Sequence, residues 1–440
     1  MSDRIHHNLP LCQLIADQIA ASPQQRITFA EYMELVLYHP QHGYYSTNTV
    51  NIGKQGDFFT SPYLAADFGE LLAEQFVEMW EILGYPTSFT LVEMGAGAGI
   101  LAADILRYLQ QRYPEFFKVL EYIIIEKASG LIAQQQETLK DWVKDWGHLR
   151  WQTWEEIPSN AIVGCCFSNE LVDAFPVHQF VVESGKLQEV YVTTAKNRLA
   201  TDFKADLTDG LRVSNEVELT MIPTDQSSVK SVTKSVANIP EFVEVIGEPS
   251  TPQLAKYFDL VGIELPSSIE GDRYRSEINL AALDWLKTLS DKLHRGYILT
   301  IDYGYLAARY YSPGRSQGTL QCYYRHQHHD NPYVYIGHQD ITAHVDFTAL
   351  QRQGDLCGLQ SVGFTKQGLW LMALGIGDRL AAISTSNQAI QQLLRRRDAL
   401  QQLIDPMGLG GFGLLVQSQG LTKEERGRSL KGLSFTEKLS

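Results

Sequence analysis

Cysteine is scarce in this sequence. Five cysteines occur among the 440 residues, an odd number, and their spacing lacks the pairs that zinc-binding cysteines form. This argues against a disulfide scaffold, and we expect a reducing compartment. The adjacent Cys165 and Cys166 lie in an apolar run, so we expect both in the core.

Long apolar runs are absent as well. No window reaches the roughly twenty apolar residues that a membrane-spanning helix requires. Residues 1–7 contain no continuous apolar stretch and little positive charge, which argues against a secretory signal. We predict a cytoplasmic protein without an integral membrane segment.

Positive charge is in deficit, because the formal net charge is -14 at pH 7. The overall field of such a chain repels nucleic acid, so we expect no nucleic-acid partner, and a basic protein surface is a better match. The run Arg395-Arg396-Arg397 lies in a segment with helical spacing, 387–403, and we interpret it as a solvated helix face.

The chain is longer than one ordinary domain, so we expect a core domain with additions. Strands alternate with helices after residue 86, the pattern of a doubly wound parallel α/β sheet. Short strands and a helix interrupt this pattern as an inserted α+β segment. The predicted divisions are a helical N-terminal section (1–85), the core (86–176 and 276–420), the insertion (177–275) and a flexible charged tail (421–440).

The N-terminal section contains segments with helical apolar spacing at 9–21, 28–37 and 63–83. Thr28 and Glu31 stand three residues apart at the start of the second segment, which is the spacing of a capping box. We expect these helices to precede the sheet.

The segment 89–100 predicts a nucleotide-type pocket. Its first half has the pattern of a buried strand that contains Glu93, and Gly95, Gly97 and Gly99 follow before a helix. These glycines allow a tight turn that brings backbone N–H groups close to a ligand. Because Ile100 occupies the sixth position, the dinucleotide fingerprint is not met. A carboxylate at position 93 would repel phosphate but would attract the cationic groups of S-adenosylmethionine.

Polar residues also follow three other predicted strands, at Glu126, at Asn169-Glu170 and at Asp302. In open parallel sheets the carboxyl ends of the strands share one rim with the ligand, so we expect these residues beside the glycine turn. Glu126 is placed to accept hydrogen bonds from the cis-diol of a ribose.

Two carboxylates near the end of the fourth core strand, Glu170 and Asp173, are candidates for handling the acceptor. Carboxylates orient a guanidinium group through bidentate hydrogen bonds and hold its charge while a proton departs. The alternative is an ordinary turn after the strand, in which Asp173 caps the next helix.

Histidine occurs in two places that invite attention. His326, His328 and His329 match no standard metal site, and we predict no metal. Thr342, His344 and Asp346 would share a face if their segment is extended, which makes His344 a candidate catalytic residue, although a structural histidine is an equal alternative.

Six short motifs occur in the order found in one known family. Over about Ile27 to Val416 the sequence resembles the MidA family, which includes the mitochondrial complex I assembly factor related to protein arginine methyltransferases. The motifs are Gly56–Pro62, Glu93–Gly97, Asn169–Pro176, Ile301–Gly304, Asp340–Phe347 and Pro406–Gly408.

This resemblance implies a class I methyltransferase fold that uses S-adenosylmethionine and dimethylates, symmetrically, an arginine of the complex I subunit that carries the quinone site. By the same resemblance the glycine turn, Glu93 and Glu126 bind the cofactor, and Gly56, Asp57 and Ser61 cover it. The residue types and their positions make Asn169, Glu170, Asp173 and His344 our candidate catalytic residues. Many relatives carry proline at the position of Ala96, a departure that removes no needed donor.

Two other readings stay open. One is a non-catalytic assembly partner that retains the fold, and the other is a methyltransferase for a small molecule. The intact glycine turn with two acids favours the enzyme, because a scaffold would not require them. The sequence does not give the oligomeric state.

Overall fold

The structure is a computed structural model that describes residues 7–47, 61–198, 239–267, 273–325, 327–383 and 389–436. Gly56 and Asp57, which we predicted to cover the cofactor, lie outside the described residues, as does His326. The strands and helices below lie within the described ranges.

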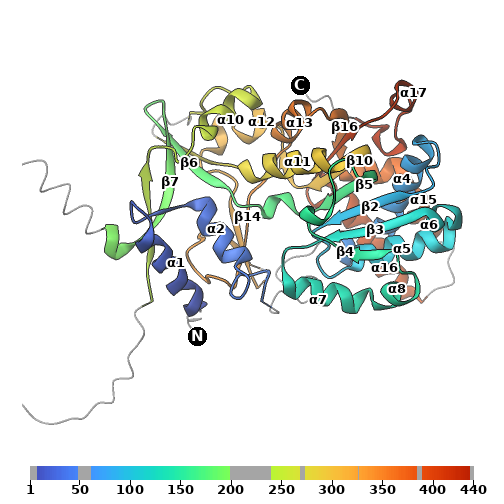
Figure 1. Ribbon diagram of the computed structural model, residues 1–440, viewed down its shortest axis with the longest axis horizontal. Coiled ribbons are helices and arrows are strands. Elements are labelled where there is room, and N and C mark those ends of the chain that lie inside the picture. Colours follow the sequence, from blue (N-terminus) through green and yellow to red (C-terminus); the bar gives the residue numbers. More distant parts are fainter. Residues whose placement is uncertain are drawn as a thin grey trace, which may run out of the picture.

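An open sheet forms the centre of the larger unit (Figure 1). Its strand order is β16-β17-β10-β5-β2-β3-β4, with parallel pairing from β10 to β4 and antiparallel pairing on both sides of β17. The chain order reverses between β2 and β5, where ligands bind in doubly wound sheets. The predicted α/β fold is confirmed. The strands are β2 (Phe89–Met94), β3 (Leu120–Ile125), β4 (Leu149–Trp151), β5 (Ile162–Asn169), β10 (Leu293–Asp302), β16 (Gln360–Lys366) and β17 (Gly413–Gln419).

Helices cover both faces of this sheet. One face packs against α4 (Asp67–Ile82), α5 (Ile100–Arg112), α14 (Gln367–Leu374) and α16 (Ile390–Ile404), and the other against α11 (Leu280–Lys292) and α13 (Phe347–Leu356). Cys165 belongs to the first core and Cys166 to the second, because neighbouring strand residues point to opposite faces. Shorter helices are α3 (Ser61–Leu64), α6 (Pro114–Val119), α7 (Ser129–Thr138), α8 (Lys140–Asp145), α12 (Ala307–Tyr310), α15 (Ile376–Ile383) and α17 (Lys423–Arg426).

The middle of the sheet contains a close contact between two glycines. Gly164 of β5 pairs with Gly296 of β10 and, on its other side, with Thr90 of β2. Their φ angles are +151° and +142°, and a Cβ atom on either glycine would overlap backbone atoms of the next strand. Only glycine fits this position without strain.

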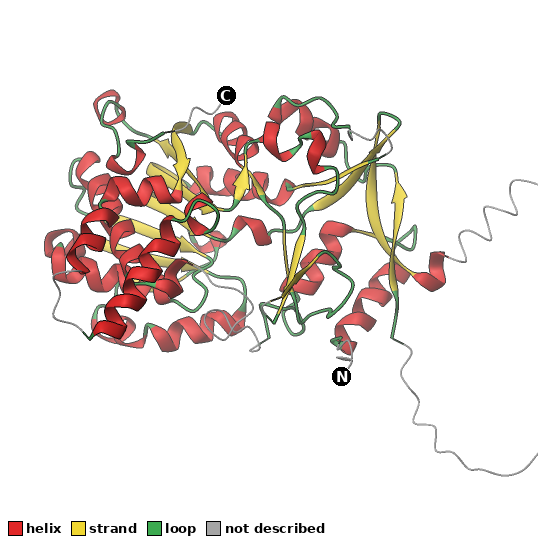
Figure 2. Ribbon diagram, turned by 180° about the vertical axis from the view of Figure 1, so that it is seen from behind, coloured by secondary structure: helices red, strands yellow, loops and turns green. Residues whose placement is uncertain are grey.

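A second unit lies beside the first one (Figure 2). Its sheet has the order β1-β7-β6-β9, with β8 paired to β7, and α1 and α2 pack against it. The predicted insertion therefore supplies most of this unit, although β9 extends past residue 275. The elements are α1 (Leu9–Ala21), β1 (Ile27–Thr28), α2 (Phe29–Tyr38), β6 (His178–Glu183), β7 (Lys186–Thr194), β8 (Phe242–Gly247), α10 (Gln253–Val261) and β9 (Tyr274–Ile278).

The N-terminal section is divided between the two units. Helix α2 begins with the expected capping box, in which Glu31 N donates to Thr28 Oγ1 at 3.1 Å and Thr28 N donates to Glu31 Oε2 at 2.7 Å. Helix α4 instead packs against α5 of the core. The single helix predicted over 63–83 is split into α3 and α4.

The start of α4 is held by arginines from far along the chain. Asp67 is buried, and Arg396 donates to it through Nε at 3.0 Å and Nη2 at 2.7 Å. Arg379 also donates to Asp67, at 3.0 Å. The interpretation of the arginine run as a solvated face is therefore wrong for Arg396, which pairs with Asp67. The sequence pattern does not show this pairing, because the two residues are far apart in the chain.

The C-terminal residues 421–436 pack against the core, in contrast to the flexible tail that we expected. Leu430 and Leu433 are buried, and Gly432 lies against the Trp370 side chain. Two leucines in a charged segment gave too weak a sequence signal for this contact. No helix in the described part of the chain has the length and apolar character to span a bilayer.

Candidate functional site

The turn after β2 borders a pocket at the carboxyl ends of the strands. Gly95 and Gly97 have φ angles of +69° and +53°, and both line the pocket together with Glu93 and Glu126. Gly99 has a different place. Its φ is +80°, it caps α5, and a Cβ atom there would meet Leu139. Gly99 thus shapes the turn, and it is not among the residues that line this pocket.

Hydrogen bonds from neighbouring residues hold the two acids of this pocket in place. Glu93 is 3% exposed, and the Tyr122 hydroxyl donates to its Oε2 at 2.7 Å. Burial raises the pKa of Glu93 to about 7. Glu126 Oε1 accepts from Lys127 N at 2.8 Å and from Ala128 N at 2.9 Å. Burial also raises the pKa of Glu126, and these hydrogen bonds oppose the shift.

Gln135 of α7 joins the glycine turn to the acid after β3. Its Nε2 donates to Gly97 O at 2.9 Å and to Glu126 Oε2 at 3.1 Å. Its Oε1 accepts from the Trp151 ring N–H at 2.8 Å. The side chain is fully buried, so it fixes the two walls of the pocket relative to each other. We did not predict Gln135, because the middle one of three consecutive glutamines in a polar helix carries no sequence signal of its own.

Glu170, directly after β5, has an unusual backbone. Its φ is +54°, the left-handed region that residues other than glycine seldom adopt, and its N–H donates to Ile301 O at 2.9 Å. Its Oε1 accepts from Ser61 N at 3.2 Å and from Asn169 Nδ2 at 3.0 Å. Burial raises the pKa of Glu170 to about 8, and the nearby Asp173 contributes. Ser61 is thus a partner of Glu170.

Asp302 holds the turn that follows Glu170. Its Oδ2 accepts from the backbone N–H groups of Leu171, Val172 and Asp173, at 3.2, 2.9 and 3.3 Å. Burial and the charges of Asp173 and Glu170 raise its pKa well above the ordinary range. The sequence places Asp302 at a strand end, but its role as an acceptor of backbone N–H groups depends on the β5–β10 pairing.

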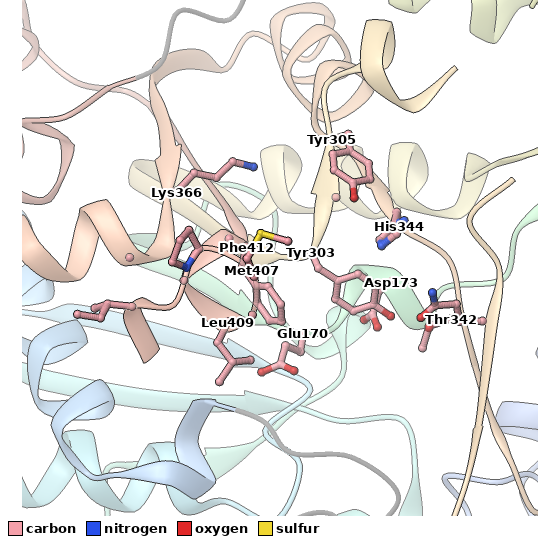
Figure 3. Close-up of a pocket in the computed structure, with 18 of the residues that line it drawn as sticks. Glu170, Asp173, Tyr303, Tyr305, Thr342, His344, Lys366, Met407, Leu409 and Phe412 are labelled. Atoms are coloured by element: carbon pink, nitrogen blue, oxygen red, sulfur yellow. The ribbon is translucent and has the colours of Figure 1, made fainter. Parts of the chain in front are cut away.

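A second cavity of about 940 Å³ adjoins the first pocket. Glu170 and Tyr45 line both spaces. The remaining walls come from both units of the structure, including the strands β11 (Gly304–Tyr305), β12 (Gln321–Tyr324) and β14 (Asp340–Thr342). Figure 3 shows Glu170 and Asp173 on one side of this cavity, with Tyr305 and Lys366 on the other. The aromatic lining residues are Tyr45, Tyr303, Tyr305, Tyr323 and Phe412.

Asp173 has unused hydrogen-bonding capacity. The residue is 6% exposed, and its Oδ1 is buried without a hydrogen-bond partner. Burial raises the pKa of Asp173 to about 6, and a hydrogen bond from Tyr303 opposes the shift. Glu170, Asp173 and Asp302 form no ion pair with any described residue. Buried acids such as Asp173 and Asp302, with the half-buried Glu170 beside them, favour a cationic ligand.

His344 lies between two tyrosines of the cavity. Its ring centroid is 5.0 Å from that of Tyr303 and 5.0 Å from that of Tyr305. Burial, Arg315 and Arg309 lower the pKa of His344 to about 4, so the ring is neutral at pH 7.

The neighbours of His344 do not all face the cavity. Thr342 lines it, but Asp346 caps α13 and accepts from Thr348 N at 2.9 Å and from Ala349 N at 3.2 Å. The extended segment that we considered is interrupted between β14 and β15 (Val345–Asp346), so the predicted common face is wrong.

Comparison with known proteins gives consistent matches. Residues 71–365 match the protein family described as "Putative S-adenosyl-L-methionine-dependent methyltransferase". The chain is 28% identical over 428 residues to the Drosophila melanogaster protein named "Protein arginine methyltransferase NDUFAF7 homolog, mitochondrial", with 90% of this chain and 82% of that protein covered. The human "Protein arginine methyltransferase NDUFAF7, mitochondrial" is 28% identical over 416 residues, with 87% and 78% covered.

A solved structure is similar over nearly the whole chain. It is a crystal structure from Burkholderia thailandensis with bound S-adenosyl-homocysteine. The TM-score is 0.75 and the sequence identity 28%, with 98% of this chain and 95% of that chain covered.

Proposed function

The chain belongs to this family of S-adenosyl-L-methionine-dependent methyltransferases, and we propose that its acceptor is an arginine side chain of a protein. One observation carries the proposal. Glu170 lines both the pocket beside the glycine turn and the larger acidic cavity, so a carboxylate stands where the two spaces meet. The names of the Drosophila and human relatives support the same acceptor.

The pocket beside the glycine turn fits the cofactor of this family. Asn169 Oδ1, at its wall, is buried without a hydrogen-bond partner and is available to a donor group of a ligand. Glu126 would accept hydrogen bonds from the ribose hydroxyls, and Glu93 would attract the cationic groups. Gly95 and Gly97 allow close approach of the backbone. S-adenosylmethionine supplies an electrophilic methyl group when it is bound.

The acids of the larger cavity suit a guanidinium group. Asp173 is buried and Glu170 is half-buried, and both lack an ion pair within the described ranges, so a cationic acceptor would offset their desolvation. Their oxygens would orient the guanidinium through charge-assisted hydrogen bonds. A nitrogen that forms a new bond to carbon must also release a proton. A carboxylate beside it, Glu170 or Asp173, would receive that proton.

The remaining residues of the cavity would position the acceptor. His344 is neutral and a weak base at pH 7, so we assign it to the cavity wall and not to proton transfer. Asp302 and Ser61 are positioning residues, because they act through the turn after β5 and through Glu170.

We further propose that the client is a subunit of an NADH dehydrogenase of the complex I type, as the family resemblance implies. A cytoplasmic location is part of the proposal. All five cysteines are free, which fits a reducing compartment.

Methyl transfer to defined acceptors tests the function. The purified protein is incubated with labelled S-adenosylmethionine and either the candidate subunit, arginine peptides or a protein-free extract. Mass spectrometry should find mono- or dimethylarginine in the protein or peptide. Cofactor binding without any transfer would favour the assembly partner, and label only in the low-mass fraction would favour a small-molecule acceptor.

A further inference from the structure

Two arginines pack on one tyrosine in the outer part of the acidic cavity. The guanidinium carbons of Arg309 and Arg315 lie 4.4 and 4.1 Å from the ring centroid of Tyr305. Tyr305 and Arg309 line the cavity, and Arg309 is exposed to solvent. The stacking holds Arg309 at the wall of the acceptor space and Arg315 beside it, on the same Tyr305 ring.

These two positive charges are not balanced by an acid. Arg275, Arg379 and Arg396 each pair with a carboxylate. Neither Arg309 nor Arg315 does so within the part of the chain that the structure describes. Two like charges on one ring repel each other, and a bound anion would relieve the repulsion. Both arginines also act on His344, so their field reaches into the cavity.

The cavity therefore has an acidic end and a basic end. Glu170 and Asp173 form the acidic end. Between them and the arginines lie the rings of Tyr303, His344 and Tyr305, and the centroid of His344 is 5.0 Å from that of each tyrosine. Figure 3 shows the same order, with Tyr305 on the side away from the two carboxylates. An acceptor that fills the cavity meets acids with one part and cations with another.

We propose that Arg309 and Arg315 bind a carboxylate of the acceptor, namely an Asp or Glu side chain close in sequence to the target arginine. This inference rests on the proposed arginine methylation. The rings of Tyr303 and Tyr305 each lie 5.0 Å from His344, and an extended peptide advances about 3.3 Å per residue, so the acid should stand within about three residues of the arginine. A peptide's terminal carboxylate has the same chemistry, and the experiment distinguishes the two sources.

The test uses the full-length protein and peptides with a single arginine in a neutral background. Glutamate is placed at each position from three residues before to three residues after the arginine, and each peptide has a glutamine counterpart. All of these peptides are amidated at the C-terminus. One further peptide has no acidic side chain and a free carboxylate next to the arginine. Peptide affinity and kcat/KM are measured for each.

We expect the kcat/KM of at least one glutamate peptide to be about tenfold above that of its glutamine counterpart, because hydrogen bonds between charged groups are the strong ones. In the Arg309→Gln/Arg315→Gln double variant this ratio should fall toward one. The exposed Arg395 lies outside the cavity lining, so Arg395→Gln serves as the matched control and should keep the wild-type ratio. Melting temperature and cofactor affinity establish that the double variant is folded.

Three results would overturn the inference. These are equal values for every glutamate and glutamine pair, a ratio that survives in the double variant, and a preference for the terminal carboxylate alone. Methylation of all peptides at equal rates would leave the proposed function intact and remove only the arginine subsite. If no peptide is methylated or bound, the proposed function fails and this inference fails with it.

Discussion

The carboxylate of Asp302 accepts a hydrogen bond from the backbone N–H of Val172 at 2.9 Å, and this contact joins the end of β10 to the turn that follows β5. The same oxygen accepts from Leu171 and Asp173, so one side chain satisfies a whole turn of backbone donors. This turn contains Asp173 and directly follows Glu170, the two acids of the larger cavity. A strand end that has no direct contact with the acceptor therefore determines the site geometry.

Replacing Asp302 with alanine should remove the acceptor for three backbone donors, of which those of Val172 and Asp173 are buried. The free energy of unfolding should fall by about 3 kcal/mol, since each unsatisfied buried donor costs about 1–3 kcal/mol. Asp302→Asn keeps one acceptor oxygen, so its loss should be smaller. Urea unfolding of both variants measures the difference, and equal losses would show that the hydrogen bonds to the turn do not matter.

Glu170→Gln should separate catalysis from cofactor binding. The side chain keeps its shape but loses the charge that would hold a guanidinium and take up its proton, so kcat should fall about 100-fold. The dissociation constant for S-adenosylmethionine should change less than about threefold, as expected for a loss confined to transfer. Glu183→Gln, an exposed site in β6, is the control. Unchanged turnover in Glu170→Gln would remove this residue from the acceptor site.

The acids of the cavity predict a pH dependence of activity. The pKa of Asp173 is raised to about 6 and that of Glu170 to about 8, so the protonated forms persist well above the ordinary range. Binding of a cationic acceptor requires the ionised forms. The kcat/KM for an arginine peptide should therefore rise from about pH 6 to about pH 8, and this limb should change in Asp173→Asn. A flat profile over this range would contradict the assignment.

The same shifts predict a pH dependence of stability. A carboxyl whose pKa is raised by folding stabilises the native state below its unfolded pKa, and this contribution is lost as pH rises through the folded value. The wild type should thus lose stability between pH 5 and pH 8.5 through Glu170, whose folded pKa is raised to about 8. Glu170→Gln should lose less, which urea unfolding at the two pH values can measure. An equal loss in both proteins would place the titration elsewhere.

Gly97→Val should abolish cofactor binding. A branched side chain at a φ of +53° strains the backbone and enters the space where the ligand must approach the turn. Gly147→Val is the matched control, because its φ is +75° but a Cβ atom there meets nothing within 4 Å. Calorimetry with S-adenosylmethionine should detect binding to the control only. Retained affinity in Gly97→Val would contradict the pocket assignment.

The sequence predicts the doubly wound sheet because its strands are apolar runs followed by polar ends, and this pattern is local. Glu93, Gly95, Gly97 and Glu126 share one pocket for the same reason, since parallel strands end on a common rim. The contacts that hold the site could not be predicted in the same way. Gln135, Asp302 and the Arg396–Asp67 pair act through residues far apart in the chain, and no local pattern announces them.

His344 illustrates another limit. Its place in the cavity depends on the interruption between β14 and β15, which turns Asp346 toward α13 and leaves Thr342 facing the cavity. Alternation along an extended segment predicts a common face only while the segment stays extended. The lowered pKa of the His344 ring depends first on burial in the folded cavity and then on Arg315 and Arg309, which stand about thirty residues away in the sequence.

The close contact between Gly164 of β5 and Gly296 of β10 affects how the ends of these strands are aligned at the site. From this pair the register of β5 and β10 runs without a bulge to Asn169 and Ile301. A Cβ atom on either glycine would overlap the backbone of the neighbouring strand, so a larger residue at either position would push these strands out of register or apart. An in-line displacement requires close alignment of the reacting groups. A substitution at Gly164 or Gly296 would shift the strand ends that carry Asn169 and Ile301, and would disturb that alignment although no residue of the site is itself replaced.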